Sequence, residues 1–235
     1  MNRQCSRHVV RRYAGHSEEP HPALPLPPFA AISVSNQTLL RETEEMPLSP
    51  FQKHKIRWLF SVLDVNRDGR VDRDDYTSRV RALARLRGWT AHSPEYERHM
   101  DRVLEEWEAV RDSADLDENG AVTAEEFVRY ADIFLDDREA VRAFARGDVQ
   151  LLFDAMDTDG DDEITIEEYR AYLEACGVDG SAADVFFAHA DLDEDGRMTR
   201  REMSHAMEEF LLSEDPDSSG NFMFGPLPPF PGPNA

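Results

Sequence analysis

Oxygen-bearing side chains recur in four segments of twelve residues, at a spacing that suits one hard cation per segment. Each segment has aspartate at position 1, aspartate or asparagine at positions 3 and 5, and a carboxylate at position 12. Hard divalent cations such as Ca²⁺ take about six to eight oxygen ligands, and flexible loops supply them at this spacing. The pattern therefore predicts four cation-binding loops, at residues 64–75, 115–126, 157–168 and 191–202.

The role of each loop position predicts the ligands. Side chains at positions 1, 3 and 5 provide one oxygen each, position 7 provides its backbone carbonyl, and position 12 provides up to two carboxylate oxygens. The predicted ligands are Asp64, Asn66, Asp68, Arg70 and Asp75 in the first loop; Asp115, Asp117, Asn119, Ala121 and Glu126 in the second; Asp157, Asp159, Asp161, Glu163 and Glu168 in the third; and Asp191, Asp193, Asp195, Arg197 and Glu202 in the fourth.

The second and fourth loops meet every requirement, since each has glycine at the sharply turning position 6 and glutamate at position 12. The first loop ends in Asp75, whose side chain is one methylene shorter. Contact through two oxygens then requires the exiting helix to move inward; otherwise the site receives a single oxygen. Because Mg²⁺ takes fewer oxygens in a smaller octahedral cage, the first loop is predicted to be a weaker or mixed Ca²⁺/Mg²⁺ site.

The third loop departs from the pattern at its turn, with Asp162 at position 6 and Gly160 at position 4. Aspartate tolerates the left-handed backbone conformation better than most residues, but at some cost. The carboxylates of this loop are all present, so it is predicted to bind calcium, with a strained turn when empty. The alternative is a folded hand that holds no ion, so the prediction is three or four Ca²⁺ sites.

Helices are expected on both sides of each loop. Ser49–Pro50 and Ser93–Pro94 combine a capping side chain with a proline suited to the first helical turn. The residues at position 8 are expected to pair across a short antiparallel bridge, Val71 with Val122 and Ile164 with Met198. The predicted fold class is all-α, with four EF-hands arranged as two paired-hand lobes in a compact globule.

Composition divides the chain into four parts. Residues 1–45 are proline-rich without a helical apolar period, which is typical of a disordered or spurious extension, and one hypothesis makes Met46 the native start. Residues 46–136 hold the first pair of loops and residues 137–212 the second. Residues 213–235 form a proline- and glycine-rich tail whose phenylalanines favour packing on the core.

The net charge of −22 argues against nucleic acid as a partner. Two distant cysteines, Cys5 and Cys176, make no disulfide framework, so a reducing, cytoplasmic location is expected. No apolar stretch approaches the length of roughly 20 residues that spans a membrane. No zinc spacing, phosphate loop or nucleophile motif is present, so we expect no enzyme. Calcium ions are the expected partners of a monomer, and a protein target is not indicated.

Four features carry a family resemblance: the loops themselves, the decreasing distance between successive loops, Asp75 at the end of the first loop, and the segment Asp215–Gly225. In these features the chain resembles the calerythrin and sarcoplasmic calcium-binding protein family, in its bacterial, actinobacterial form. The resemblance covers about residues 47–225. It implies a compact four-hand fold and a role in calcium buffering or transport. Family members often have one hand without ligands, whereas all four hands keep theirs here.

Two functions remain open from the sequence. The leading prediction is an intracellular, soluble calcium buffer. The alternative is a calcium sensor that exposes an apolar groove to bind a partner, which Met198, Met203 and Met207 favour because sensor grooves are rich in methionine. Against a sensor, the segment Phe222–Phe224 could fill such a groove from within the chain.

Overall fold

The computed structural model describes residues 48–175 and 177–230. The expectations for residues 1–45, Met46, Cys5 and Cys176 lie outside them. The elements are, in chain order, α3 (Pro50–Leu63), β1 (Arg70–Val71), α4 (Arg73–Arg87), α5 (Pro94–Ala114), β2 (Val122–Thr123), α6 (Ala124–Asp136), α7 (Arg138–Met156), β3 (Ile164–Thr165), α8 (Ile166–Ala175), α9 (Ala182–Ala190), β4 (Arg197–Met198), α10 (Arg200–Leu212) and the 3₁₀ helix η1 (Ser219–Phe222).

The predicted helix starts at Ser49 and Ser93 are confirmed. The Ser49 hydroxyl accepts a hydrogen bond from the Gln52 N–H at 3.2 Å, and the Gln52 side chain accepts one from the Ser49 N–H at 3.0 Å. Proline follows each serine as the first residue of α3 and α5. Proline has no N–H to donate, but no hydrogen bond is lost at this position, because the first helical N–H groups have no partner within the helix.

Two short antiparallel bridges join the loops in pairs. Val71 of β1 is opposite Val122 of β2, and Ile164 of β3 is opposite Met198 of β4, as the sequence predicted. All four side chains are 0 % exposed. The all-α fold with paired hands is therefore confirmed.

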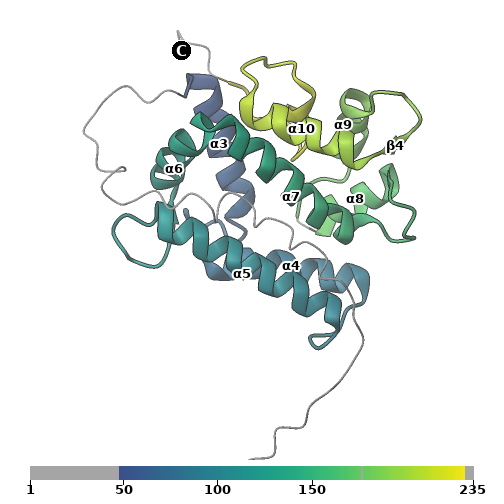
Figure 1. Ribbon diagram of the computed structural model, residues 1–235, viewed down its shortest axis with the longest axis horizontal. Coiled ribbons are helices and arrows are strands. Elements are labelled where there is room, and N and C mark those ends of the chain that lie inside the picture. Colours follow the sequence, from purple (N-terminus) through teal and green to yellow (C-terminus); the bar gives the residue numbers. More distant parts are fainter. Residues whose placement is uncertain (1–47, 176, 231–235) are drawn as a thin grey trace, which may run out of the picture.

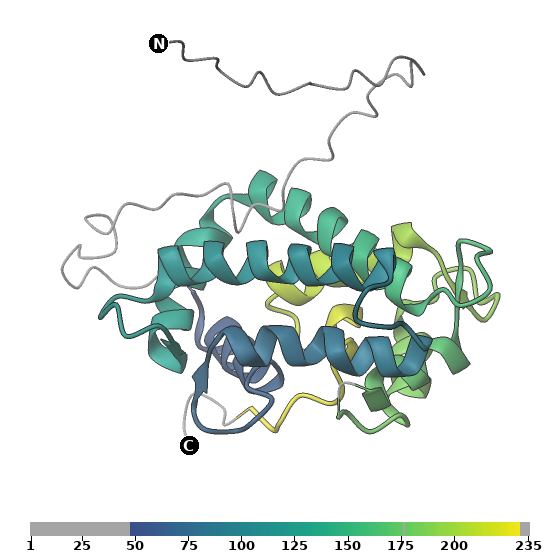
Figure 2. The ribbon, with the colours of Figure 1, turned by 90° about the horizontal axis from the view of Figure 1, so that it is seen from below.

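The helices enclose one hydrophobic core. Figures 1 and 2 show α4 and α5 running alongside each other at one edge, with α7 and α10 forming another packed pair. The hands also meet across the pairs, because α4 packs on α8 and α10 packs on α3. Apolar residues from α3 to α10 and from the C-terminal segment form one continuous buried cluster.

The helices in the described part of the chain are too short or too polar for any of them to cross a membrane.

Candidate metal centres

The first aspartate of each loop closes the turn that follows it. One carboxylate oxygen of Asp64 accepts from the Asp68 N–H at 3.1 Å and the other accepts from the Gly69 N–H at 2.9 Å. Asp115 and Asp191 contact the matching residues of their own loops. The third loop differs, since Asp157 accepts from Gly160 and Asp162. These bonds direct the position-1 carboxylate into the loop.

The position-12 carboxylate ties both ends of its loop to the exiting helix. Glu126 accepts from the Leu116 N–H at 3.1 Å and from the Thr123 N–H at 2.8 Å. Glu168 and Glu202 make the equivalent bonds in the third and fourth loops. In α6 and α10 these bonds form a capping box, in which Thr123 or Thr199 is the N-cap and the predicted ligand, Glu126 or Glu202, is the third helical residue.

Three loops bring carboxylates together as a cation site requires. The carboxylate oxygens at positions 1, 3 and 12 approach one another within 4.8 Å in Asp115, Asp117 and Glu126; in Asp157, Asp159 and Glu168; and in Asp191, Asp193 and Glu202. The first loop has the amide of Asn66 at position 3, which leaves two carboxylates for this cluster. These oxygen-only donors fit the hard Ca²⁺ ion.

The first loop compensates for its short final side chain. Asp75 accepts from the Val65 N–H at 3.1 Å and from the Asp72 N–H at 3.0 Å, the same two positions that the glutamates reach elsewhere. Asp75 is only 2 % exposed, so α4 begins close against the loop. Burial raises the pKa of Asp75, although hydrogen bonds from Asp72, Asn66 and Val65 oppose the shift. These contacts favour the inward helix among the two geometries predicted for this ending, and contact with an ion through two oxygens stays a prediction.

In the third loop, the glycine and the non-glycine residue with left-handed backbone conformation occupy each other's usual positions. Asp162 has a φ of +68° and Gly160 a φ of +79°. Each of the other loops also has two residues in this region, glycine at position 6 and Arg67, Glu118 or Glu194 at position 4. Every loop thus holds one glycine and one non-glycine residue there. Because aspartate adopts this conformation more readily than arginine or glutamate, the turn at Asp162 costs no more than its counterparts.

The environment of the carboxylates differs from loop to loop. Loss of hydration and the negative charges of Asp195 and Glu202 raise the pKa of Asp193. Burial acts in the same direction on Glu168, but hydrogen bonds from Thr158 and Thr165 outweigh it and lower the pKa of that carboxyl. A bound cation would stabilise the charged form of both side chains.

The position-7 residues lie in or next to the short strands, and their role as carbonyl ligands stays a prediction. One of them has a contact that sequence reasoning missed. The Arg197 guanidinium donates to Asp161 at 2.6 Å and to Glu163 at 3.0 Å. The pairing of Ile164 with Met198 places Arg197 beside the third loop, so the register could have revealed this contact.

These helix–loop–helix units define a calcium-binding protein of the EF-hand class. The family described as an EF-hand domain pair matches residues 53–132, and the family described as EF hand matches residues 149–173. Sarcoplasmic calcium-binding proteins I, III and IV of Branchiostoma lanceolatum are 24 % identical over 187 residues, covering 77 % of this chain and 100 % of the relative. The chain therefore contains EF-hand domains and is similar, over most of its length, to sarcoplasmic calcium-binding proteins.

Two further comparisons agree with this family. The luciferin-binding protein of Renilla reniformis is 25 % identical over 180 residues, covering 75 % of this chain and 95 % of the relative. The solved structure of a Streptomyces coelicolor calcium-binding protein is 26 % identical, with a TM-score of 0.57 over 68 % of this chain and 97 % of that chain. The resemblance to sarcoplasmic calcium-binding proteins inferred from the loops is confirmed, and the Streptomyces structure shows that a bacterial protein shares the fold.

Proposed function

We propose that the protein is a calcium buffer whose four loops bind Ca²⁺ through the predicted ligands, without exposing a binding groove for a partner. The three carboxylate clusters support the second, third and fourth sites. The hydrogen bonds of Asp75 support the first. The proposal gives no loop residue a catalytic role, and it places the protein in the cytoplasm.

The observation that carries this proposal is the position of the C-terminal segment. Met223 is 1 % exposed, and its carbonyl accepts a hydrogen bond from the Tyr169 hydroxyl of α8. Phe224 packs edge-to-face on Phe210 of α10, with ring centroids 5.1 Å apart. Phe222 stacks on His189 of α9 at 4.0 Å. The segment thus covers apolar side chains that a sensor would present to its target.

Gly220 makes this close approach of the tail possible. A Cβ at this position would lie 2.1 Å from the Ala206 carbonyl oxygen and 2.3 Å from the Phe210 nitrogen. Both atoms belong to the backbone of α10, which cannot rotate away as a side chain could. Any larger residue must therefore lift the tail from the helix.

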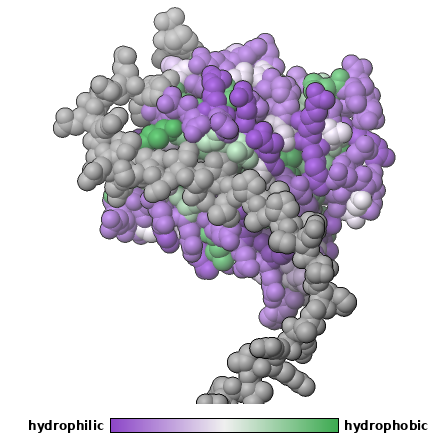
Figure 3. Space-filling model, viewed as in Figure 1, coloured by the Kyte–Doolittle hydropathy of each residue, from purple (hydrophilic) through white to green (hydrophobic). Residues whose placement is uncertain are grey.

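The second candidate is a sensor in which calcium releases the tail. Met207 is 2 % exposed and lines the same cavity as Phe224 of the tail, so this methionine would be uncovered if the tail left. Methionine side chains adapt to varied partners, which favours such a role. In the present conformation the tail packs on α9 and α10, and Figure 3 shows a mainly hydrophilic face where described residues are visible.

Retention on a phenyl-substituted resin, in calcium and in EDTA, separates the two candidates. The full chain should pass through in both conditions, whereas Gly220→Val and a chain ending at Leu212 should be retained in calcium. Asp217→Ala is the control, because Asp217 is an exposed residue of the same tail. Strong calcium-dependent retention of the full chain would favour the sensor instead.

A further inference from the structure

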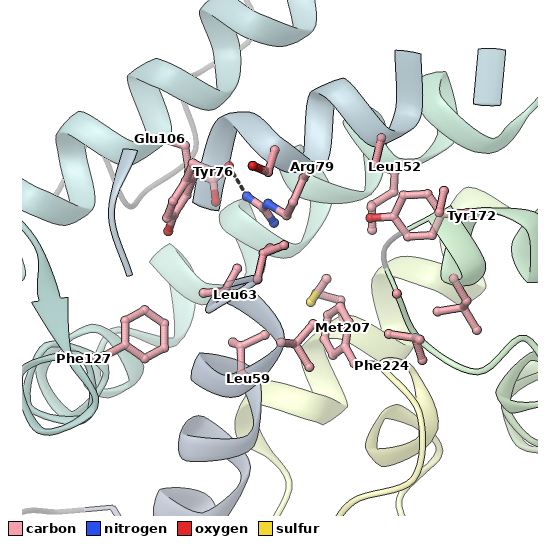
Figure 4. A pocket seen from close by; sticks show the side chains of 18 of the residues that line it. Leu59, Leu63, Tyr76, Arg79, Glu106, Phe127, Leu152, Tyr172, Met207 and Phe224 are labelled. Atoms are coloured by element: carbon pink, nitrogen blue, oxygen red, sulfur yellow. Dashed lines mark ion pairs between the residues drawn. The ribbon is translucent and has the colours of Figure 1, made fainter. Parts of the chain in front are cut away.

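A large cavity lies between the helices and reaches the first loop at Val65. Its volume is about 380 Å³, and residues from α3, α4, α5, α6, α7, α8, α10 and the C-terminal segment line it. Figure 4 shows side chains from these elements converging on one space. Protein interiors are normally packed as closely as organic crystals, with few voids larger than one water molecule. A cavity of this size is therefore a feature that requires an occupant or a reason to stay empty.

The lining of the cavity is mainly apolar and aromatic. Tyr76, Phe127, Phe144, Tyr172 and Phe224 contribute rings, and leucine, valine and methionine side chains fill the remainder. Water is a poor occupant for such a site, because a buried water needs about two to four polar partners. Apolar cavities of about 150 Å³ can stay dry and bind a benzene ring. This cavity is larger, so a molecule with more than one ring would fit.

The charged groups of the lining are few, and all of them come from α4 and α5. The Arg79 guanidinium forms an ion pair with Glu106 at 3.7 Å and lies 4.8 Å from the centroid of the Tyr76 ring. Figure 4 shows Arg79 and Glu106 together on α4 and α5, opposite Leu59 and Phe224. Sites for small molecules combine this apolar lining with a few fixed polar groups, at volumes of about 300–1,000 Å³.

The cavity is accessible to a ligand. Val65 is 46 % exposed, and Arg85 and Gly177 are also exposed, although all three belong to the lining. A smaller cavity of about 80 Å³ shares Arg79, Glu106, Leu152 and Tyr172 with the large one and extends it along α5. The site thus has an entrance and room beyond its main volume.

We propose that this cavity binds a small, mainly apolar organic molecule with an aromatic ring system. The ring system packs among the aromatic side chains, where offset and edge-to-face contacts stabilise it beyond the burial of its surface. Its polar group faces the Arg79–Glu106 ion pair. None of the predicted metal ligands lines the cavity, although Val65 and Tyr76, the neighbours of Asp64 and Asp75, do.

The test uses N-phenyl-1-naphthylamine, an uncharged two-ring probe whose fluorescence rises in apolar surroundings. The full chain should bind one probe per molecule. Ala82→Trp, which places an indole in the cavity from α4, should weaken binding by at least about tenfold, because the inserted side chain occupies the ligand volume. Ala109→Trp is the matched control: Ala109 is a half-buried alanine of α5 outside the lining, so binding should stay within about twofold.

A second filling variant covers the case in which Ala82→Trp fails to fold. Ala175→Phe introduces a ring from α8 at another lining position and should weaken binding in the same way. Circular dichroism and calcium titration establish that each variant is folded. The proposal is overturned if the full chain does not bind the probe with a stoichiometry of one, or if a folded filling variant binds it as tightly as Ala109→Trp does.

Discussion

Arg197 of the fourth loop donates a hydrogen bond of 2.6 Å to Asp161, a predicted metal ligand of the third loop. Arg197 also pairs with Glu163 of the same loop. Its positive charge and a bound cation would therefore compete for the Asp161 carboxylate. The fourth loop thus contributes a counter-charge to the third across the bridge between β3 and β4. The two hands of a pair are linked through charge as well as through apolar packing.

Arg197→Ala should increase the calcium affinity of the third loop. Removing the guanidinium frees the Asp161 carboxylate, and because exposed ion pairs contribute at most about 1 kcal/mol, the gain should be about two- to fivefold. Calcium titrations followed through the Ile164 amide signal report on this loop. Arg200→Ala is the control, because Arg200 pairs at 2.6 Å with Asp162, which is not among the predicted ligands. Equal effects of the two variants would contradict a specific role for Arg197.

Asp75→Glu should shift the first loop toward calcium. The longer side chain allows contact through two oxygens without the close approach of α4, and a larger cage favours Ca²⁺ over Mg²⁺. In excess magnesium, calorimetry should show the calcium affinity of this loop rising about tenfold. Glu126→Asp in the second loop should have the opposite effect. A loss of calcium affinity in Asp75→Glu would mean that the buried site has no room for the added methylene.

Local features of this protein could be predicted from the sequence. The positions of the loops follow from a fixed spacing, the starts of α3 and α5 follow from Ser49 and Ser93, and the bridges follow from apolar residues at position 8. Each of these depends on residues close together in the chain or on one repeated contact. The left-handed backbone at Glu118 and its counterparts was missed, because only glycine signals that conformation in a sequence.

Features that depend on distant packing could not be predicted. The cavity near Tyr172 arises where helices of both pairs meet without filling the space, and no spacing pattern encodes a void. The tail contact at Gly220 could be predicted in part, because the phenylalanines of the C-terminal segment indicated that this segment packs on the core. The need for glycine there follows only from the distance to the α10 backbone.

Gly160→Ala should destabilise the calcium-free protein by about 1–2 kcal/mol. Its φ of +79° favours glycine, and nothing lies within 4 Å of an added Cβ, so backbone strain alone is measured. Gly120→Ala has the same geometry in the second loop, with φ +85°, and should cost about as much. Urea unfolding in EDTA measures both. A much larger loss for Gly160→Ala would show that the third loop is the more strained.

Replacing Lys55 should change how stability depends on pH. Lys55 is 1 % exposed and donates to the Ser213 carbonyl at 2.6 Å at the end of α10. Burial lowers the pKa of Lys55 to about 8, while the charges of Glu209 and Glu214 oppose the shift. Between this pKa and the ordinary lysine value of about 10.4, the unfolded chain binds more protons than the folded one. The burial cost is therefore fully present below pH 8 and disappears as pH rises.

Lys55→Met has no proton to lose, so the wild type should gain stability relative to this variant from about pH 8 to pH 10.5. The total gain should be about 3 kcal/mol, which corresponds to the pKa difference between folded and unfolded chain. Urea unfolding at a series of pH values measures it. Lys53→Met, at the chain's only other lysine, is the control for the loss of an amine from the same helix. If Lys55→Met and the wild type have parallel stability profiles across this range, the ammonium group is not buried at a cost.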